Sequence, residues 1–267
     1  MYRQILSPQN ATVKQLFQLR EKSRNRKKEQ LFLIEGIQEI VLALEGKYVI
    51  TEIYICFDIL TIEDFENQFS KYISNVSITE ISVEVYEKLA YRTSTEGILA
   101  VAKWRDLSLA NLQLESKIPL LLIAEAPEKP GNIGALLRTA DAANVDAVII
   151  ANPRTDMYNP NIIRSSVGCV FTNRIATGST TEIIDYLKTQ KINIFSAILQ
   201  EALPYTTQDF TKPAAIVVGT EHNGLSEEWR ISSTQNIIIP MSGSVDSMNV
   251  SVAAGILIFE AKRQRSC

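Results

Sequence analysis

The sequence has few of the residues that build disulfides or metal sites. Its 267 residues include three cysteines and one histidine. The cysteines Cys56, Cys169 and Cys267 lie far apart and form no Cys-x-x-Cys pair, and His222 alone leaves too few soft ligands for a zinc site. These shortages predict a cytoplasmic protein that has no disulfide and binds no metal.

Long apolar runs are also missing. No run reaches the roughly 20 residues that a membrane-spanning helix needs. Residues 1–30 are polar and basic, without the apolar core of a signal peptide. We therefore expect no association with membranes. Hydrophobic residues still make up 46% of the chain, which is enough for real cores in one large domain or two ordinary ones.

The net charge of −3 hides a local concentration of positive charge. Six cations fall within nine positions, just after an apolar stripe of helical spacing at Val13, Leu16 and Phe17. They are Arg20, Lys22, Arg24, Arg26, Lys27 and Lys28. One interpretation is the solvated end of a helix, where cations favour the macrodipole. The other is a patch that binds the phosphates of a nucleic acid, and the cluster alone does not decide between them.

The pattern of the chain predicts two α/β domains. Residues 1–105 alternate short apolar runs with helical patterns, as in a small α/β domain, and the polar residues 106–117 are expected to be a linker. From 118 to 267 the runs are continuously apolar, which favours a parallel sheet covered on both faces. Its expected strands are 119–124, 146–151, 192–198, 214–219 and 236–240. The last helix, expected over 247–263, is apolar nearly all round and should be buried.

Three loops follow strands of this expected sheet, at the edge where open parallel sheets bind ligands. The first contains two glycines, Asn132 as a candidate helix cap, and Arg138 on an otherwise small or apolar helix. It has neither a G-x-G-x-x-G fingerprint nor a P-loop ending. The second runs over 218–226, and its two glycines and a carboxylate suggest a pocket lined by backbone. The third, 239–251, places polar side chains at the start of the final helix, where they need partners.

In this order and spacing, the three loops resemble the signature motifs of the SpoU (TrmH) family of RNA ribose 2′-O-methyltransferases, within the SPOUT class. The matching positions are Asn132, Gly134 and Arg138, then Gly219, Glu221 and Gly224, then Ile239 to Ser251. The match covers residues 118–267, and the amino-terminal half resembles the family's RNA substrate-binding domain. Lys129 stands where the family often has aspartate, and Met248 replaces the commoner leucine.

The resemblance implies a parallel-sheet SPOUT domain with a deep trefoil knot, preceded by a small α/β RNA substrate-binding domain. It also implies S-adenosylmethionine as methyl donor and a homodimer formed through the knotted domain. Gly219, Ile239 and Met248 are the positions expected to contact the cofactor.

The resemblance also places Arg138 at the catalytic centre. A guanidinium is a poor base, so we interpret Arg138 as a charge that orients the target phosphate and stabilises the developing alkoxide. Asn132, Glu221, Ser247 and Asn249 are expected to position Arg138 and the nucleotide.

The function predicted on this basis is methylation of a ribose 2′-hydroxyl, in rRNA rather than tRNA by analogy. An alternative is a non-catalytic RNA-binding protein that retains the fold, although such a protein has no chemical reason to keep Arg138, Glu221 and Asn249. A second alternative is a small-molecule methyltransferase, which would not need the basic cluster.

Overall fold

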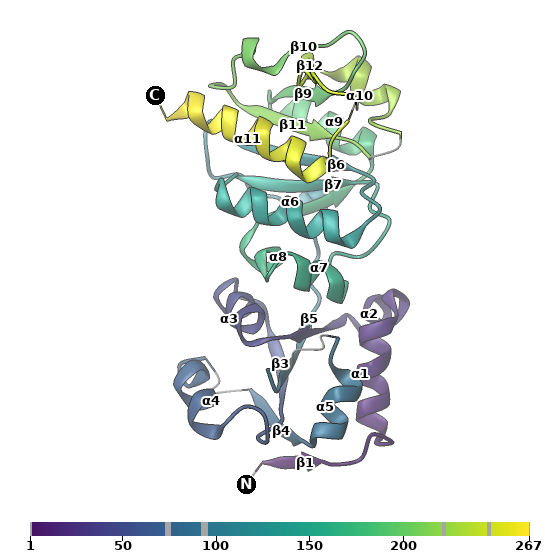
Figure 1. Cartoon of the computed structure of the whole chain (residues 1–267), viewed down its shortest axis with the longest axis vertical. Helices are drawn as coiled ribbons and strands as arrows, with labels where there is room; N and C mark the ends of the chain where they lie inside the picture. Colours follow the sequence, from purple (N-terminus) through teal and green to yellow (C-terminus); the bar gives the residue numbers. More distant parts are fainter. Residues whose placement is uncertain (1, 73–75, 92–95, 221–222, 245–246, 267) are drawn as a thin grey trace. The chain divides into compact units, whose positions relative to one another are not determined.

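The computed structural model describes residues 2–72, 76–91, 96–220, 223–244 and 247–266. The chain forms two compact units (Figure 1). The first unit comprises Met1–Arg105 together with Asp156–Thr172, and the second comprises Asp106–Thr155 together with Asn173–Cys267. Across the described ranges, no helix has the length and apolar composition needed to cross a bilayer.

The first unit contains a five-stranded mixed sheet with the order β1-β4-β3-β5-β2. The strands are β1 (Arg3–Ile5), β2 (Leu31–Glu35), β3 (Ile50–Ile55), β4 (Ser77–Ile81) and β5 (Ile98–Lys103). Strands β1, β4 and β3 are parallel to one another, and β5 pairs antiparallel with both β3 and β2.

Helices cover this sheet. Those from the amino-terminal part are α1 (Ala11–Glu21), α2 (Ser23–Glu29), α3 (Ile37–Glu45), α4 (Ile62–Phe69) and α5 (Val83–Leu89). Helices α1 and α5 pack together over one core, with Val13, Leu16 and Leu19 of α1 buried in it. The helical spacing of apolar residues before the basic cluster therefore correctly indicated a helix.

Two short helices of the first unit come from far along the chain, and the sequence patterns did not indicate them. They are α7 (Pro160–Ser165), which packs on β2, and α8 (Cys169–Thr172), which packs on α3. Aromatic rings hold the segment in place: Tyr158 stacks on Phe32 with 4.2 Å between ring centroids, and Phe171 meets Tyr48 edge-on at 5.0 Å. Such pairs add to the free energy gained by burying the rings.

The second unit contains a seven-stranded sheet in which every pair is parallel, with the order β10-β12-β9-β11-β6-β7-β8. Its strands are β6 (Leu120–Glu125), β7 (Ala147–Ala151), β8 (Ile175–Gly178), β9 (Asn193–Ala197), β10 (Leu203–Pro204), β11 (Ala214–Val218) and β12 (Gln235–Ile238). The five expected strands are present. The short strands β8 and β10 were not predicted.

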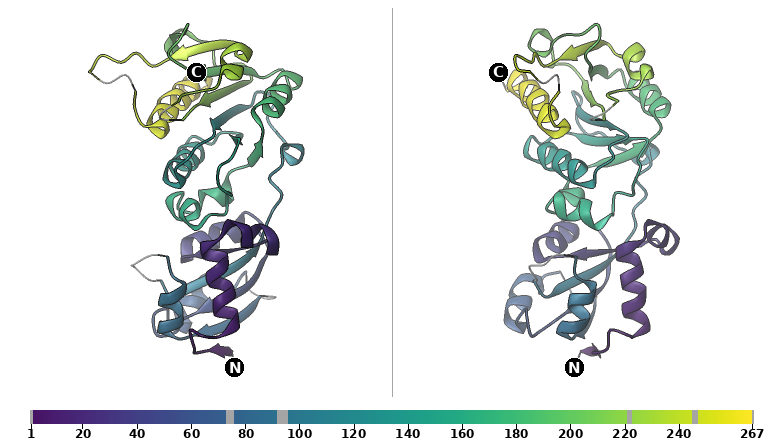
Figure 2. Two further views of the ribbon diagram at one scale, coloured as in Figure 1. Left: turned by 90° about the vertical axis from the view of Figure 1, so that its right-hand side faces the viewer. Right: turned by 45° about the vertical axis from the view of Figure 1, so that its right-hand side comes forward.

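Helices lie on both faces of this sheet, as its continuously apolar strands required. They are α6 (Pro130–Ala142), α9 (Thr180–Thr189), α10 (Glu227–Ser232) and α11 (Val250–Arg265). Helix α11 packs against α6, β11 and β6, while α9 and α10 pack against β9 (Figure 2). Residues 106–117 also lie in this unit, where Leu109, Leu112 and Leu114 pack against its core.

The expectation that the final helix is buried all round is wrong. One face is buried, through Ala254, Leu257 and Ile258, but Val252 and Phe259 are 53% and 51% exposed. The two exposed residues are seven positions apart and so lie on the same face of the helix. Helix α11 therefore presents an apolar strip to its surroundings.

Candidate functional site

The three loops lie at the carboxyl ends of strands β6, β11 and β12 of the second unit. Strand β11 lies directly between β6 and β9, and β12 follows β9 in the same sheet. Because the strands are parallel, their carboxyl ends meet at one edge, where open α/β sheets bind ligands. The order of strands therefore brings together loops that are about a hundred residues apart in the sequence.

Asn132 does not cap helix α6, contrary to its predicted role as a cap. Lys129 is the N-cap residue and Pro130 takes the first helical position, so Asn132 lies within the first turn. Proline is well suited to that position, since it fixes φ and has no N–H to satisfy. The Asn132 side chain is instead turned toward the third loop, where its Oδ1 accepts a hydrogen bond of 3.3 Å from Nδ2 of Asn249.

Asn249 is the N-cap of α11, and its side chain is held from two directions. Its Oδ1 accepts hydrogen bonds from the backbone N–H of Ser251 at 2.9 Å and from the Ser251 hydroxyl at 2.6 Å. The same side chain donates through Nδ2 to Asn132. The polar residues at the start of α11 are therefore partners of each other and of the first loop.

Arg138 lies on α6 beyond Asn132, and its side chain is exposed. Within the described part of the chain, it makes no hydrogen bond or ion pair. The next residue, Thr139, lies on the side of α6 that packs toward Gly255 of α11. Arg138 is thus an unneutralised cation whose backbone is held rigidly by the packing of two helices.

The second loop is a tight turn. Thr220 and Gly224 exchange two backbone hydrogen bonds of 3.1 Å, and Gly224 has a φ of 64°, which favours glycine. A Cβ atom on Gly219 would lie 2.3 Å from the carbonyl carbon and oxygen of Gly224. Glycine at 219 is therefore required by the close approach of the loop's own backbone. Glu221 and His222 lie outside the described residues.

An open pocket with a volume of about 1040 Å³ lies between the second and third loops. Ile239, Ser247 and Met248 line it, together with Leu199 and Leu225. A smaller depression beside it is lined by Lys129 and Asn132 of the first loop, Gly219 and Thr220 of the second, and Val250 of α11. Parts of all three loops therefore meet around one region of the surface.

Glu125, at the end of β6, is a buried residue of this region that the sequence analysis missed. Its carboxylate accepts hydrogen bonds from the hydroxyls of Thr180 at 2.7 Å and Ser226 at 2.8 Å, and from the backbone N–H of Ser226 at 2.7 Å. Ser226 ends the second loop and begins α10. A carboxylate directly after an apolar strand was the only signal in the sequence, and its partners lie 55 and 101 residues away.

We expect Glu125→Ala to lower the free energy of unfolding by about 1–3 kcal/mol, because the hydroxyl of the buried Thr180 loses its acceptor. It should also weaken binding of S-adenosylmethionine, since Ser226 anchors the loop that borders the pocket. Denaturant unfolding and calorimetric titration measure the two effects. Glu115→Ala, at an exposed ion pair with Arg174, is the control and should change neither. Unchanged cofactor affinity in Glu125→Ala would show that Glu125 does not support the cofactor site.

The six cations of the basic cluster do not share one environment. Lys22, Arg24, Lys27 and Lys28 are exposed, whereas Arg20 is half-buried and donates to the carbonyls of Lys88 and Ala90. The prediction that Arg26 binds RNA is wrong for a physical reason, since its side chain is only 2% exposed.

The guanidinium of Arg26 is bound within the first unit. It donates to both carboxylate oxygens of Asp156, at 3.0 and 2.7 Å, and to the carbonyls of Leu19 and Arg20. Its charge is paired in a buried, two-pronged contact, and its burial keeps it out of reach of an RNA phosphate. Arg26 instead fastens Asp156 and the segment that follows it onto α1 and α2.

No group of three or more His, Cys, Asp or Glu side chains in the described ranges is arranged to hold a metal. The polar side chains around the pocket are the amides and hydroxyls of Gln200, Thr220, Asn223 and Ser247, together with the charged groups of Glu201, Glu227 and Arg230. Such a site suits an organic ligand held by packing and hydrogen bonds.

Comparison with known proteins assigns the region that contains the three loops to a family. The SpoU rRNA Methylase family matches residues 119–259, and an MRM3-like substrate binding domain matches residues 10–100. The chain is 28% identical to the 23S rRNA (guanosine(2553)-2′-O)-methyltransferase RlmP of Bacillus subtilis, over 97% of this chain and 99% of that one.

Two solved structures are similar over almost the whole chain. An RNA 2′-O ribose methyltransferase has a TM-score of 0.84 and 35% identity, covering 99% of this chain and 100% of its own. The SpoU methyltransferase AviRb from Streptomyces viridochromogenes, in complex with the cofactor AdoMet, has a TM-score of 0.85 and 26% identity, covering 97% and 99%. The parallel sheet, the pocket and these similarities together define a SPOUT-type methyltransferase. The chain belongs to the SpoU rRNA methylase family.

Proposed function

We propose that the protein transfers a methyl group from S-adenosylmethionine to a ribose 2′-hydroxyl of RNA, and that the RNA is ribosomal rather than transfer RNA. The observation that carries the proposal is the meeting of the three family loops at one edge of the parallel sheet, beside a pocket of cofactor size. Similarity to the Bacillus subtilis 23S rRNA enzyme over nearly both full lengths supports rRNA as the substrate.

The residues of the pocket suit an adenosyl cofactor. Ile239, Met248 and Leu225 offer apolar surface for a flat heterocycle, and the tight turn of the second loop, which Gly219 permits, offers backbone groups at the rim. When bound, S-adenosylmethionine supplies an activated methyl group. The deep trefoil knot that the family fold implies would keep the second and third loops beside each other and so make the pocket rigid.

Arg138 would act on the RNA. Its guanidinium orients the target phosphate and stabilises the negative charge that develops on the 2′-oxygen. The hydrogen bond between Asn132 and Asn249 fixes the start of α6 against the start of α11. Both residues would thereby position the nucleotide next to Arg138, and we assign the same positioning role to Glu221 and Ser247.

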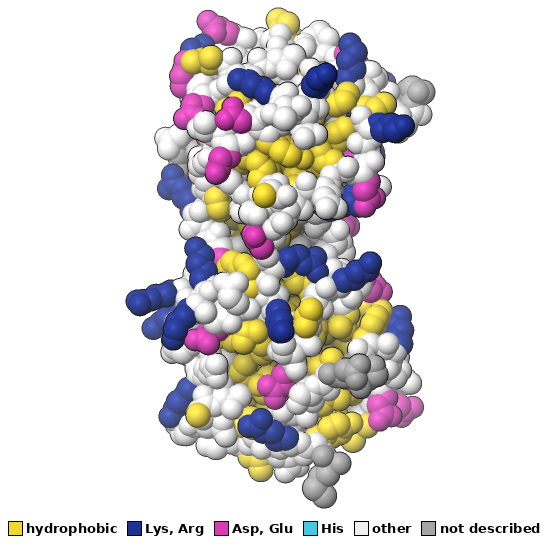
Figure 3. Space-filling model, turned by 180° about the vertical axis from the view of Figure 1, so that it is seen from behind, with side chains coloured by type: hydrophobic (Ala, Val, Ile, Leu, Met, Phe, Trp, Pro, Cys, Tyr) yellow, Lys and Arg dark blue, Asp and Glu magenta, His cyan; other side chains and the backbone are white. Residues whose placement is uncertain are grey.

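The exposed cations of the first unit would bind RNA phosphates. Lys22, Arg24, Lys27 and Lys28 lie on or beside helix α2, and Arg20 contributes from the end of α1. On the face of the molecule seen in Figure 3, Lys and Arg side chains occur on both units. The short basic helix therefore supplies a local positive potential on an overall acidic protein.

Changing Arg24 and Lys27 to alanine should weaken RNA binding and reduce its salt dependence by about one unit of slope per removed contact, leaving cofactor affinity unchanged. Filter binding of rRNA at several salt concentrations measures both effects. Arg26→Ala is the contrasting variant, because removing one partner of a buried ion pair costs about 3–5 kcal/mol of stability. Unchanged RNA affinity in the Arg24 and Lys27 variant would mean that α2 is only a solvated helix.

The second copy of a homodimer would cover helix α11. Val252 and Phe259 form an exposed apolar strip on this helix, and apolar surface of this kind marks contact sites when it is contiguous.

We place the protein in the cytoplasm, where ribosomal RNA is available.

Two measurements separate this function from a non-catalytic RNA-binding role. Calorimetric titration with S-adenosylmethionine should show binding, and labelled methyl should appear in rRNA as alkali-resistant dinucleotides, which mark 2′-O-methylation. Binding of RNA with no cofactor binding at millimolar concentration would support the non-catalytic alternative. Methyl transfer to small molecules without RNA retention at low salt would support the small-molecule enzyme instead.

A further inference from the structure

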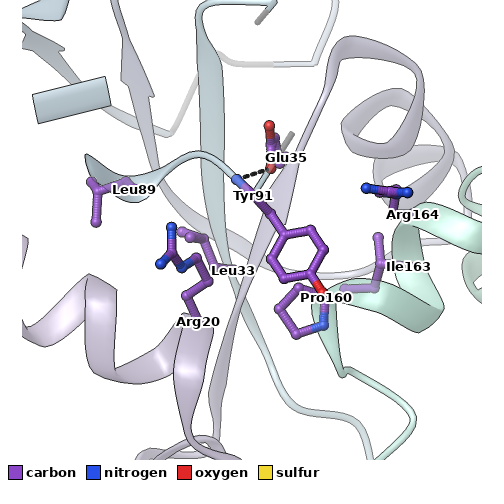
Figure 4. A pocket seen from close by; sticks show the side chains of 8 residues that line it. All are labelled: Arg20, Leu33, Glu35, Leu89, Tyr91, Pro160, Ile163 and Arg164. Atoms are coloured by element: carbon purple, nitrogen blue, oxygen red, sulfur yellow. Dashed lines mark hydrogen bonds between the residues drawn. The ribbon is translucent and has the colours of Figure 1, made fainter. Parts of the chain in front are cut away.

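The first unit carries a shallow pocket that none of the expected site residues except Arg20 touches. Its floor is apolar and includes Leu33 and Ile163, and its rim carries Tyr91 and the two cations Arg20 and Arg164 (Figure 4). Helix α7 contributes Pro160, Ile163 and Arg164, and the remaining residues precede Arg105. The pocket thus combines residues from both regions matched by the family comparisons.

The ring of Tyr91 is exposed, but its backbone is held firmly. The Tyr91 N–H donates to Oε2 of Glu35 at 2.7 Å, as Figure 4 shows, and the carbonyl of Ala90 accepts from Arg20 at 2.7 Å. The residue is 45% exposed, while Leu33, Leu89 and Ile163 beside it in the pocket are buried. A ring fixed at its base and open to solvent is ready to stack on a flat partner without losing much conformational entropy.

Arg164 supplies a charge next to that ring. Its Cζ lies 5.8 Å from the Tyr91 ring centroid, within the range of a cation–π contact. The side chain is exposed, and within the described ranges its guanidinium makes no hydrogen bond or ion pair. All of its N–H donors are therefore available to an external acceptor, such as a phosphate.

We propose that the exposed surface around this pocket, whose enclosed volume of about 10 Å³ holds no more than one water molecule, binds one unpaired nucleotide of the RNA substrate. The base stacks on the exposed ring of Tyr91, and Arg164 binds the adjacent phosphate. Stacking on an exposed aromatic ring beside an arginine is the chemistry by which proteins recognise single-stranded RNA. A phosphate alone would not account for the exposed ring, and an apolar ligand would not account for the free guanidinium. The choice of RNA rests on the proposed function.

This pocket distinguishes unpaired from paired nucleotides, which the basic helix α2 does not. Contacts from α2 to phosphates act on single and double strands alike, whereas stacking on Tyr91 needs a base that has left its helix. The pocket therefore favours RNA that contains an unpaired nucleotide. Because Arg20 donates a hydrogen bond to the carbonyl of Ala90, it acts as a positioning residue for Tyr91.

The test compares a short fluorescein-labelled oligouridine with an RNA duplex of equal length, by fluorescence anisotropy with the full-length protein. Tyr91→Ala should weaken single-strand binding by about 5- to 100-fold, the scale of one lost stacking contact, and leave duplex binding nearly unchanged. Tyr91→Phe should bind as the wild type does. Arg164→Gln should weaken single-strand binding and lower its salt slope by about one.

Tyr72→Ala is the matched control. Tyr72 also lies beside a cation, with Nζ of Lys71 4.6 Å from its ring centroid, but its hydroxyl donates to Glu45 and it lines no pocket described here. It should leave both affinities unchanged. Wild-type affinity for the oligouridine in Tyr91→Ala would overturn the proposal, and so would a lower unfolding temperature with unchanged RNA affinity. Methyl transfer is not the readout, so failure of the proposed enzyme activity would be detected separately.

Discussion

Replacing Arg138 by alanine is expected to lower the rate of methyl transfer by at least about 100-fold, the scale of losing one preorganised electrostatic contact. Arg138 is an exposed cation on a helix held by packing against α11. The backbone that carries this charge is therefore held in place, and the guanidinium has no partner within the described residues to leave before it meets the RNA. Single-turnover transfer of labelled methyl to the RNA measures the effect directly, without a contribution from product release.

Two controls separate a catalytic from a structural role for Arg138. Arg138→Lys should restore little activity, because an ammonium cannot reproduce a planar, two-pronged contact. Binding of S-adenosylmethionine should survive both changes, since the expected cofactor contacts lie in the other two loops. If Arg138 were only a surface residue, alanine would cost about 1 kcal/mol of stability or less and barely alter transfer. Near-normal transfer in Arg138→Ala would contradict the proposed mechanism.

Gly219→Val is expected to abolish binding of S-adenosylmethionine while the protein remains folded. A Cβ at this position would lie 2.3 Å from backbone atoms of Gly224 and 2.6 Å from the nitrogen of Leu225. Those atoms belong to backbone and not to a flexible side chain, so the turn itself must open. Thr220, Gly224 and Leu225 line the pocket, which therefore loses its shape. Calorimetric titration measures the affinity, and circular dichroism measures the fold.

Gly131→Ala is the control for this substitution. Gly131 lies in the first loop, and a Cβ there would meet nothing within 4 Å. Alanine at 131 should therefore leave cofactor affinity and stability as in the wild type. Cofactor affinity at the wild-type level in Gly219→Val would exclude the second loop from the cofactor site.

The sheet of the second unit could be predicted because strands such as β6 and β11 contain continuous apolar runs of five residues. Strand β8 and helices α7 and α8 could not, because four to six residues are too few to show a period. The spacing of apolar residues also does not show which unit α7 packs against. Its place in the first unit depends on rings such as Tyr158 and on the pair between Asp156 and Arg26.

Side-chain roles were predicted less well than elements. Arg26 was grouped with its exposed neighbours because charge density along the sequence does not reveal a buried partner 130 residues away. Asn132 was expected to cap α6. The helix instead begins at Pro130, so Asn132 lies within its first turn and accepts a hydrogen bond from Asn249. Glu125 escaped notice because only the fold brings Thr180 and Ser226 to it.

Methylation of a ribose 2′-hydroxyl in ribosomal RNA is tested most directly by a map of 2′-O-methylated nucleotides in rRNA and tRNA from cells with and without the gene. We expect one rRNA position to lose its methyl group in the deletion strain. The wild-type gene should restore that methyl group, and the Arg138→Ala gene should not. An rRNA map identical in the two strains, or a lost methyl group found only in tRNA, would contradict the proposed function.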